Sequence, residues 1–349
     1  MVDVIAPSAR DLVSKPARVP SPRISVAVLL LIALTACSPD DPDSSEGTAS
    51  SANTDPAETT ATFPEISGEF GQTPTVEFSG SPDADSVETL IVTGGTEGAV
   101  TPHDLVASHQ VFYEWGADGS VREAYSSYDG APLLLSMTVL AEIAPEAAEA
   151  FEGQGVGTRL AMVFPPYESS IVPDSESVED GASTLFVYDI VDRYPAGLTV
   201  DQEEGDAIYD GRGELPDVRV PQGEQPQVTV PDTDPPEELV ATTLIEGDGE
   251  PATAGSTLIT QFHGQTWDDE TEFDSTWAYG AVPKDFQLDP SSLILGWLEG
   301  LEGVRSGSRV MLTVPPEWGY GSTGNVAVDL GPDETLVYVI DVLDVIPPL

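Results

Sequence analysis

Basic residues are scarce in this sequence. Its 349 residues include 12 Lys and Arg against 61 Asp and Glu, which gives a formal net charge of -49. Lysine occurs only at Lys15 and Lys284. A surface so poor in cations repels the phosphate backbone of nucleic acids, and no basic cluster offsets that repulsion. The sequence therefore predicts no DNA or RNA partner, and it predicts that most of the acidic side chains cover a solvated surface.

Cysteine and histidine are almost missing as well. Cys37 is the only cysteine, so the chain must fold without an internal disulfide. The three histidines do not form an HExxH motif, and neither a paired CxxC nor a GxSxG motif occurs. These absences give no support for a metal site, a bound cofactor or a nucleophilic hydrolase. The sequence predicts a protein that needs none of them.

One hydrophobic run lies near the N-terminus. Basic residues precede the run ISVAVLLLIAL at 24–34, and LTAC closes it at Cys37. The run is typical of a secretory signal and is short for a membrane span. LTAC resembles the lipobox of bacterial lipoproteins. We expect residues 1–36 to be a lipoprotein signal peptide and Cys37 to carry a lipid anchor on the extracytoplasmic face of the cell membrane. An ordinary signal peptide with a chance cysteine is the alternative.

The remainder divides by composition. Residues 37–71 are Ser, Thr, Asp, Glu, Pro and Ala with few large apolar side chains, which predicts a disordered acidic tether. A second polar stretch with several Pro and Gly residues, 197–222, is predicted as a linker. Two folded domains are expected on either side of it, at 72–196 and 223–349.

These two domains are similar in sequence. GVGTRLAMVFPP at 155–166 parallels RSGSRVMLTVPP at 305–316, and TLFVYDIVD from Thr184 parallels TLVYVIDVLD from Thr335. Two further matches precede these at nearly the same spacing: PTVEF at 74–78 with PQVTV at 226–230, and TLIVTGGTEG from Thr89 with TLIEGDGE from Thr243. Ordered matches at a nearly constant separation indicate a duplicated domain.

Each copy is predicted to be α+β, with a twisted antiparallel sheet packed on one short helix. The apolar, β-branched runs bounded by Gly or Pro predict strands. A helix is expected after DPSS, capped by Ser291 or Ser292. In the first copy APEAAEAF takes its place, with Pro145 in the first turn. The helix of the second copy places four apolar residues on one face: Leu293, Trp297, Leu298 and Leu301.

The second copy resembles the FKBP family of peptidyl-prolyl cis-trans isomerases. The motifs LITQFHG, TEFDST, LILGWLEG, PPEWGYG and DETLVYVIDVLDVI carry the resemblance over about 226–346. It implies isomerisation of X-Pro bonds in proline-containing polypeptides that fold outside the cytoplasmic membrane, and it implies that a macrolide inhibitor can bind. The alternative is a non-catalytic FKBP-like lipoprotein that only binds or chaperones extended segments.

The resemblance also implies the site. Trp297 corresponds to the floor of an apolar pocket, and Asp274 to a polar group near the twisting amide. The catalytic set is Asp274, Phe273, Trp297 and Tyr320, and the substrate-binding set is Phe262, Leu293, Ile294, Leu330 and Tyr338. Rotation about X-Pro has a barrier because amide resonance stabilises the planar forms. A dry aromatic cavity with donors placed for the twisted amide lowers that barrier without a nucleophile or a metal.

Two segments and the residue Asn325 depart from the family pattern. The segment WAYGAVPKD at 277–285 is one residue longer than usual, and Val282 or Lys284 stands where an aromatic residue and an arginine are common. Asn325 replaces a common histidine, and the loop from there to Leu330 is also longer. These departures affect substrate preference and drug affinity more than the activity.

The first copy keeps the frame but loses the site residues. Ala124 and Tyr125 replace the Phe-Asp pair, and Ala147 replaces the floor tryptophan. Ser170 falls opposite Tyr320, and His109 is aligned with Phe262. We therefore expect a degenerate first domain without isomerase activity.

Overall fold

The computed structural model describes residues 63–82, 86–166, 182–202 and 207–348. The predicted signal peptide, Cys37 and most of the predicted tether lie outside the described residues. Within the described ranges no helix is long and apolar enough to cross a membrane.

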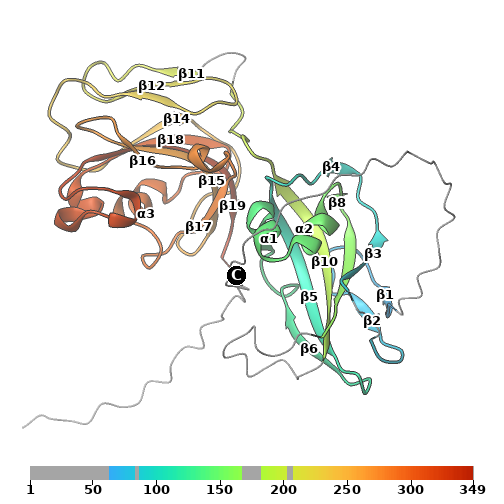
Figure 1. Ribbon diagram of the computed structural model, residues 1–349. Coiled ribbons are helices and arrows are strands. Elements are labelled where there is room, and N and C mark those ends of the chain that lie inside the picture. The colour runs from blue at the N-terminus through green and yellow to red at the C-terminus, as the bar shows by residue number, and fades with distance from the viewer. Residues whose placement is uncertain (1–62, 83–85, 167–181, 203–206, 349) are drawn as a thin grey trace, which may run out of the picture. The chain divides into compact units, whose positions relative to one another are not determined.

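The first domain is built on a six-stranded antiparallel sheet (Figure 1). Two short helices, α1 (Met137–Ile143) and α2 (Pro145–Phe151), pack on one of its faces. A small pair, β4 (Glu97–Ala99) and β8 (Gly155–Val156), lies outside the sheet. The strands of the sheet are β3 (Glu88–Thr93), β5 (Leu105–Trp115), β6 (Val121–Ser126), β7 (Leu133–Ser136), β9 (Arg159–Phe164) and β10 (Ser183–Tyr194). Their order is β3-β9-β10-β5-β6, and β7 also pairs with β5.

The second domain repeats this plan. Its sheet has the order β14-β18-β19-β15-β16, with β17 also paired to β15, and one helix, α3 (Leu295–Leu301), covers a face. The strands are β14 (Val240–Ile245), β15 (Thr257–Thr266), β16 (Glu272–Ser275), β17 (Lys284–Gln287), β18 (Ser308–Val314) and β19 (Leu336–Ile346). Four 3-10 turns complete it: η1 (Trp277–Tyr279), η2 (Pro316–Trp318), η3 (Gly321–Thr323) and η4 (Val326–Val328). The predicted α+β fold class is confirmed.

The central strands of the second sheet are buried on both faces. Side chains alternate between faces along a strand. In β18, Val310, Leu312 and Val314 pack on the α3 side, whereas Met311 faces the other way. In β19, Tyr338 belongs to the α3 side and Val339 to the opposite side. A second layer must therefore cover the face opposite the helix.

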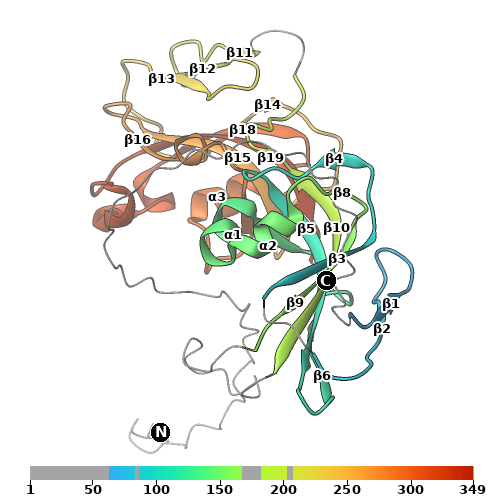
Figure 2. The same ribbon diagram turned by 45° about the vertical axis from the view of Figure 1, so that its right-hand side comes forward.

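A small three-stranded sheet forms that second layer. Its strands are β11 (Ala207–Tyr209), β12 (Asp217–Val220) and β13 (Gln227–Thr229). Figures 1 and 2 show it over one face of the large sheet, with α3 on the other. Val218 and Val220 are buried against Trp267, Met311 and Val339. The stretch predicted as a linker, 197–222, thus supplies two strands, because its apolar residues alternate in DVRV and bury one side.

The first domain has a comparable cover. The hairpin of β1 (Glu65–Ser67) and β2 (Thr75–Glu77) places Ile66 and Val76 against the face opposite α1 and α2. The end of the predicted tether, 65–71, is therefore ordered. Ile66 and Val76 each stand between more exposed neighbours, so one inward-facing residue per strand packs this hairpin against the sheet.

A buried Arg-Asp pair joins each sheet to a segment that precedes it in the chain. In the first domain Arg159 Nε and Nη2 donate to the carboxylate of Asp189 at 2.6 and 2.7 Å. The same guanidinium donates to the carbonyl oxygens of Gly68 and Gln72, and the Gly71 N–H donates to Asp189. The segment between β1 and β2 is thus bonded to both members of the pair.

The second domain repeats the pair. Arg309 Nη2 donates to Asp341 Oδ2 at 2.8 Å, and Arg309 Nη1 donates to the Gln202 side-chain oxygen at 2.7 Å. The Val200 N–H donates to the Asp341 carboxylate at 3.1 Å. Residues 200–202 therefore belong with the second domain. The folded part of this domain begins well before residue 223.

The helix ends differ partly from the predictions. Helix α2 begins at Pro145 as expected, but α1 was not predicted; Ser136 caps it by accepting from the Val139 N–H. The predicted serine cap of α3 is wrong. Ile294 occupies the N-cap without a side-chain bond, because Ser291 and its neighbour Ser292 bond within a turn built on Asp289.

The cover of the second domain generates a prediction. A fragment of residues 197–349 should be more stable than one of residues 223–349. Burying a valine contributes about 1.5–3 kcal/mol, so losing Val218 and Val220 should cost several kcal/mol of unfolding free energy. Urea denaturation followed by circular dichroism measures the difference. In the longer fragment Val218→Ala should lower the urea midpoint, whereas Ile208→Ala should not, because Ile208 is 75% exposed. Equal midpoints for the two fragments would show that the small sheet contributes no stability.

Candidate functional site

Trp297 lies at the centre of a group of aromatic rings in the second domain. Its ring centroid is 5.3 Å from those of Phe262 and Tyr338, and 5.2 Å from that of Phe286. Phe273 in turn meets Tyr338 at 5.4 Å. All four contacts are edge-to-face, an arrangement that aromatic pairs favour. The rings come from α3 and from β15, β16, β17 and β19, so separate strands hold the walls around one helix.

The structure brings the predicted site residues together. Trp297, Phe262, Leu330 and Tyr338 are buried in the core beneath α3. The other apolar members are partly buried and pack against that core: Phe273, Leu293, Ile294 and Tyr320. Trp318 packs there too, so the PPEWGYG segment closes one side of the group.

A polar edge borders the rings. Burial raises the pKa of the Tyr338 phenol well above its ordinary value, and the nearby Tyr320 and Asp274 raise it further. Tyr338 therefore stays a neutral hydrogen-bond donor at any ordinary pH. The Trp297 indole lies beside this hydroxyl and lowers its pKa, although among the described residues its buried N–H has no partner within normal hydrogen-bond limits.

A backbone donor lies at the start of α3. The Ile294 carbonyl accepts from the N–H groups of Trp297 and Leu298. The Ile294 N–H itself makes no hydrogen bond within the described part of the chain. As the N-cap of a helix, Ile294 presents this N–H at the end where backbone donors have no partner in the helix.

The extra residue at 277–285 is absorbed by a tight turn. After η1, Gly280 and Ala281 both have positive φ angles, 81° and 57°. The chain then enters β17, in which Lys284 and Phe286 lie on the same face of the strand. Phe286 joins the aromatic group, and Lys284 lies at its edge. Sequence reasoning missed Phe286 as a site residue, although the alternation in KDFQ would have placed it beside Lys284.

Lys284 contacts several members of the site. Its Nζ lies 3.9 Å from Asp274 Oδ1, 5.7 Å from the ring centroid of Phe262 and 4.7 Å from that of Tyr279. The two charged side chains are 41% and 30% exposed. Lys284 therefore takes the position between Asp274 and the aromatic wall. Val282, the other candidate, is not among the hydrophobic residues that pack against this core.

The longer loop before Leu330 is closed on itself. Asn325 and Leu330 exchange backbone hydrogen bonds, N–H to O, at 3.0 and 2.9 Å. Asp329 takes up the extra length with a φ of 53°. The loop thus keeps Leu330 in the core, at 6% exposure, while Val326 at its tip is 95% exposed.

Two glycines let α3 approach the sheet closely. A Cβ on Gly296 would lie 2.5 Å from Val314 Cγ1, and one on Gly300 would lie 2.6 Å from Leu312 Cδ2. Both partners are on β18. The spacing of four residues puts both glycines on the face of the helix that meets the strand, and this close contact sets the depth of Trp297.

Aromatic side chains stand at the corresponding strand positions in the first domain. The strand register places Phe112 opposite Phe186 and Tyr125, as it places Gly264 opposite Tyr338 and Asp274. A Cβ on Gly264 would lie 2.9 Å from the Tyr338 ring. In the first domain, Phe112 stacks on Tyr125 at 5.8 Å and meets Phe186 at 5.1 Å. Ala147, at the position of the floor tryptophan, is buried in α2.

The register corrects one alignment. His109 pairs with Asp189, and Gln261 pairs with Asp341, so His109 corresponds to Gln261. Gln110, not His109, stands at the position of Phe262. The correspondence of Ser170 with Tyr320 lies outside the described residues.

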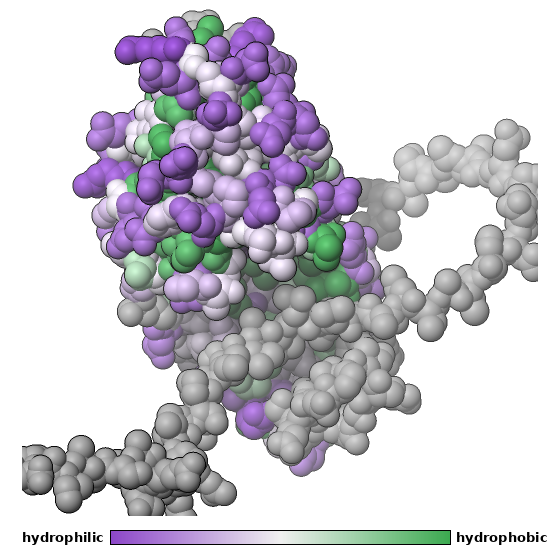
Figure 3. Space-filling view, turned by 90° about the vertical axis from the view of Figure 1, so that its left-hand side faces the viewer, coloured by the Kyte–Doolittle hydropathy of each residue, from purple (hydrophilic) through white to green (hydrophobic). Residues whose placement is uncertain are grey.

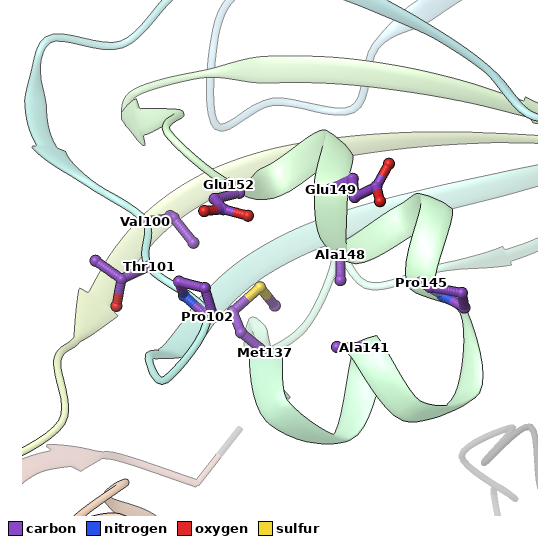
Figure 4. A pocket seen from close by; sticks show the side chains of 9 residues that line it. All are labelled: Val100, Thr101, Pro102, Met137, Ala141, Pro145, Ala148, Glu149 and Glu152. Carbon is purple, nitrogen blue, oxygen red and sulfur yellow. The ribbon is translucent and has the colours of Figure 1, made fainter. Parts of the chain in front are cut away.

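A pocket in the first domain contains none of these residues. Its volume is about 140 Å³, and it lies between α1, α2 and the segment after β4 (Figure 4). Apolar side chains and two glutamates line it: Val100, Thr101, Pro102, Met137, Ala141, Pro145, Ala148, Glu149 and Glu152. Among the described residues, no group of His, Cys, Asp or Glu could hold a metal ion.

Comparison with known proteins identifies the second domain. Residues 248–343 match the family FKBP-type peptidyl-prolyl cis-trans isomerase. The chain is 36% identical over 108 residues to the FK506-binding protein of Streptomyces anulatus, which covers 31% of this chain and 86% of that protein. It is 36% identical over 109 residues to the FKBP-type isomerase FkpA of Escherichia coli K12, covering 38% of that protein. The crystal structure of FkpA from Escherichia coli matches 31% of this chain and 48% of that chain, with 35% identity and a TM-score of 0.29.

The fold and the matched segment define a peptidyl-prolyl isomerase. The chain belongs to the FKBP-type peptidyl-prolyl cis-trans isomerase family. The matched residues span the sheet from the approach to β15 through most of β19, and they include the whole aromatic group.

The contact between α3 and β18 generates a prediction. Gly296→Ala should lower the unfolding free energy by about 1–3 kcal/mol, because the new methyl group meets Val314, whose β-branched side chain has one strongly preferred rotamer. Alanine normally stabilises a helix relative to glycine by about 0.8–1 kcal/mol, so a loss would identify the close contact as its cause. The control is Glu299→Ala, an exposed position in the same helix. Urea denaturation compares the two. A Gly296→Ala variant as stable as the control would contradict the tight packing.

Proposed function

We propose that the second domain isomerises X-Pro bonds of polypeptides in a pocket formed by the rings around Trp297. The observation that carries this proposal is the convergence of Trp297, Tyr338 and Phe262 at centroid distances of 5.3 Å, next to the carboxylate of Asp274. Family membership gives the reaction, and this geometry suggests the place. Asp274, Phe273, Trp297 and Tyr320 act on the amide, and the other five predicted residues hold the substrate.

The reaction needs only solvation and orientation. The planar X-Pro amide is more dipolar than the twisted one, so transfer from water into an aromatic cavity disfavours the planar form. The Ile294 N–H is free to bind a substrate carbonyl, and the neutral Tyr338 hydroxyl lies at the polar edge with Asp274. Donors that hold the twisted geometry lower a barrier of about 18–20 kcal/mol without any covalent step.

In this proposal the first domain has no isomerase activity. Phe112 and Tyr125 stack on each other, no carboxylate stands at the position of Asp274, and Ala147 replaces the floor. Its 140 Å³ hollow between the helices is lined mainly by apolar side chains and does not contain the family motif residues. The domain is then a binding or spacer module.

We further propose that the protein acts at the extracytoplasmic face of the cell membrane, anchored through Cys37. The support is the sequence alone: basic residues, an apolar run and LTAC in the order of a lipoprotein signal. Proline-containing exported polypeptides would be the substrates there. A macrolide inhibitor would compete with them, with an affinity altered by the 277–285 segment.

Substituting Asp274 tests the isomerase. In the full chain, Asp274→Val should reduce the rate of cis-trans exchange of proline peptides by about 10–1,000-fold, since it removes one placed polar group and keeps the apolar walls. Asp248→Val, an exposed position in the same domain, should leave the rate unchanged. NMR exchange spectroscopy measures both. A folded wild-type chain that leaves several X-Pro peptides unaffected would favour the non-catalytic binding alternative.

Substituting Cys37 tests the anchor. Each buried methylene of an acyl chain contributes about 0.8 kcal/mol to membrane binding, so two or more chains hold a protein stably. Cys37→Ser should release the protein from the membrane fraction, whereas Ser38→Ala should not. Immunoblots of salt-washed membranes compare them. Cys37→Ser protein that stays in the washed membrane would exclude the lipid anchor.

A further inference from the structure

The lysine at the edge of the site is unusual for this protein. Acidic residues outnumber basic ones by 61 to 12, and Lys284 is the only lysine among the described residues. Hydrophilic side chains cover most of the face in Figure 3, and hydrophobic ones gather there only in small groups. Lys284 nevertheless lies against an aromatic wall. The only described lysine therefore places its positive charge at the edge of the proposed substrate site.

The contacts of Lys284 hold the ammonium group in place without using its hydrogen-bond capacity. The rings of Tyr279 and Phe262 attract the cation through their faces at 4.7 and 5.7 Å. The ion pair with Asp274 is long, at 3.9 Å. An ammonium group has three N–H donors, and one distant carboxylate does not engage them all. The side chain is also 41% exposed, so a second carboxylate can reach it.

The two arginines within residues 223–348 have different surroundings. Arg309 is buried in its pair with Asp341. Arg305 donates to the Gly249 carbonyl, on a segment that contributes no ring to the aromatic group. An acidic side chain near the rings therefore finds its favourable partner in Lys284, within a protein that otherwise repels it.

We propose that Lys284 makes this site selective for polypeptides that carry Asp or Glu next to the proline. This inference rests on the proposed function, because it requires that a proline segment binds at the rings around Trp297. A carboxylate beside the bound proline pairs with the ammonium group, and the ring faces of Tyr279 and Phe262 keep that group at the entrance.

A merely structural lysine makes a different prediction. If Lys284 only packed against the rings of Tyr279 and Phe262, its removal would change the rates for all peptides by the same factor. The proposed selectivity changes the ratio between an acidic peptide and its neutral counterpart. Comparing that ratio between wild type and variant removes the general repulsion of acidic peptides, which both proteins share.

The test is a double-mutant cycle between the protein and the peptide. The peptides are acetyl-Ala-Glu-Pro-Phe-amide and acetyl-Ala-Ala-Pro-Glu-amide, each compared with its Gln counterpart. The full-chain proteins are wild type, Lys284→Gln and Lys284→Arg. Arg305→Gln is the matched control, since it removes the same single charge from the same domain. NMR measures both the exchange rate and the dissociation constant of each pair.

In at least one peptide pair the Glu-to-Gln ratio should be about two- to fivefold higher for wild type than for Lys284→Gln, the range of exposed ion pairs. Lys284→Arg and Arg305→Gln should keep the wild-type ratio. The difference should vanish between about 0.01 and 1 M salt, as the Debye length falls from about 30 to 3 Å.

The outcomes separate the two proposals. Catalysis with equal ratios in wild type and Lys284→Gln overturns the selectivity and leaves the isomerase intact. Peptide binding without catalysis, with a ratio that depends on Lys284, overturns the isomerase and supports the selectivity. Absence of both catalysis and binding overturns both.

Discussion

The buried Arg-Asp pair on the face opposite the helix is the constraint on which each domain depends. Arg309 and Asp341 are directly opposite each other on β18 and β19, and both are almost fully buried. A buried charge without its partner costs about 3–5 kcal/mol, so any other strand register is strongly disfavoured. A slip by one residue would turn Arg309 into the apolar core under α3 and would turn Tyr338 away from it. The pair thus selects which side chains form the site.

The same pair explains how two copies share a frame and differ in their sites. Arg159 and Asp189 hold the first domain in the same register, and in both domains the preceding segment bonds to the pair. The frame therefore depends on residues that the site does not use. Sequence differences on the face that carries the helix leave this frame undisturbed. One example is Tyr125, which stands at the position of Asp274. The ion pair is present in a domain that has Tyr125 and Ala147 at the positions of the carboxylate and the tryptophan.

Much of this arrangement could be predicted from sequence because local composition and family motifs carry it. The apolar, β-branched runs RVMLTV and TLVYVIDVL predicted strands, and the resemblance to the FKBP family implied the ring group. The covers were missed because each depends on one or two inward residues in very short strands, such as Val218 and Val220. The α3 cap was missed because Asp289 competes for the serines. The equivalence of Gln110 and Phe262 required the paired register, which a single strand does not contain.

The two domains differ in the residue at one strand position, which is Gly264 in the second domain and Phe112 in the first. Gly264 in β15 leaves room for the Tyr338 ring, which in turn reaches Trp297 and the polar edge at Asp274. Phe112, at the equivalent position, fills that room and stacks on its neighbours. An aromatic ring there stabilises the sheet, because it packs against the rings of Tyr125 and Phe186. In the second domain the glycine instead lets the Tyr338 ring meet Trp297 edge to face. The ring group of the second domain therefore depends on the absence of a side chain at residue 264.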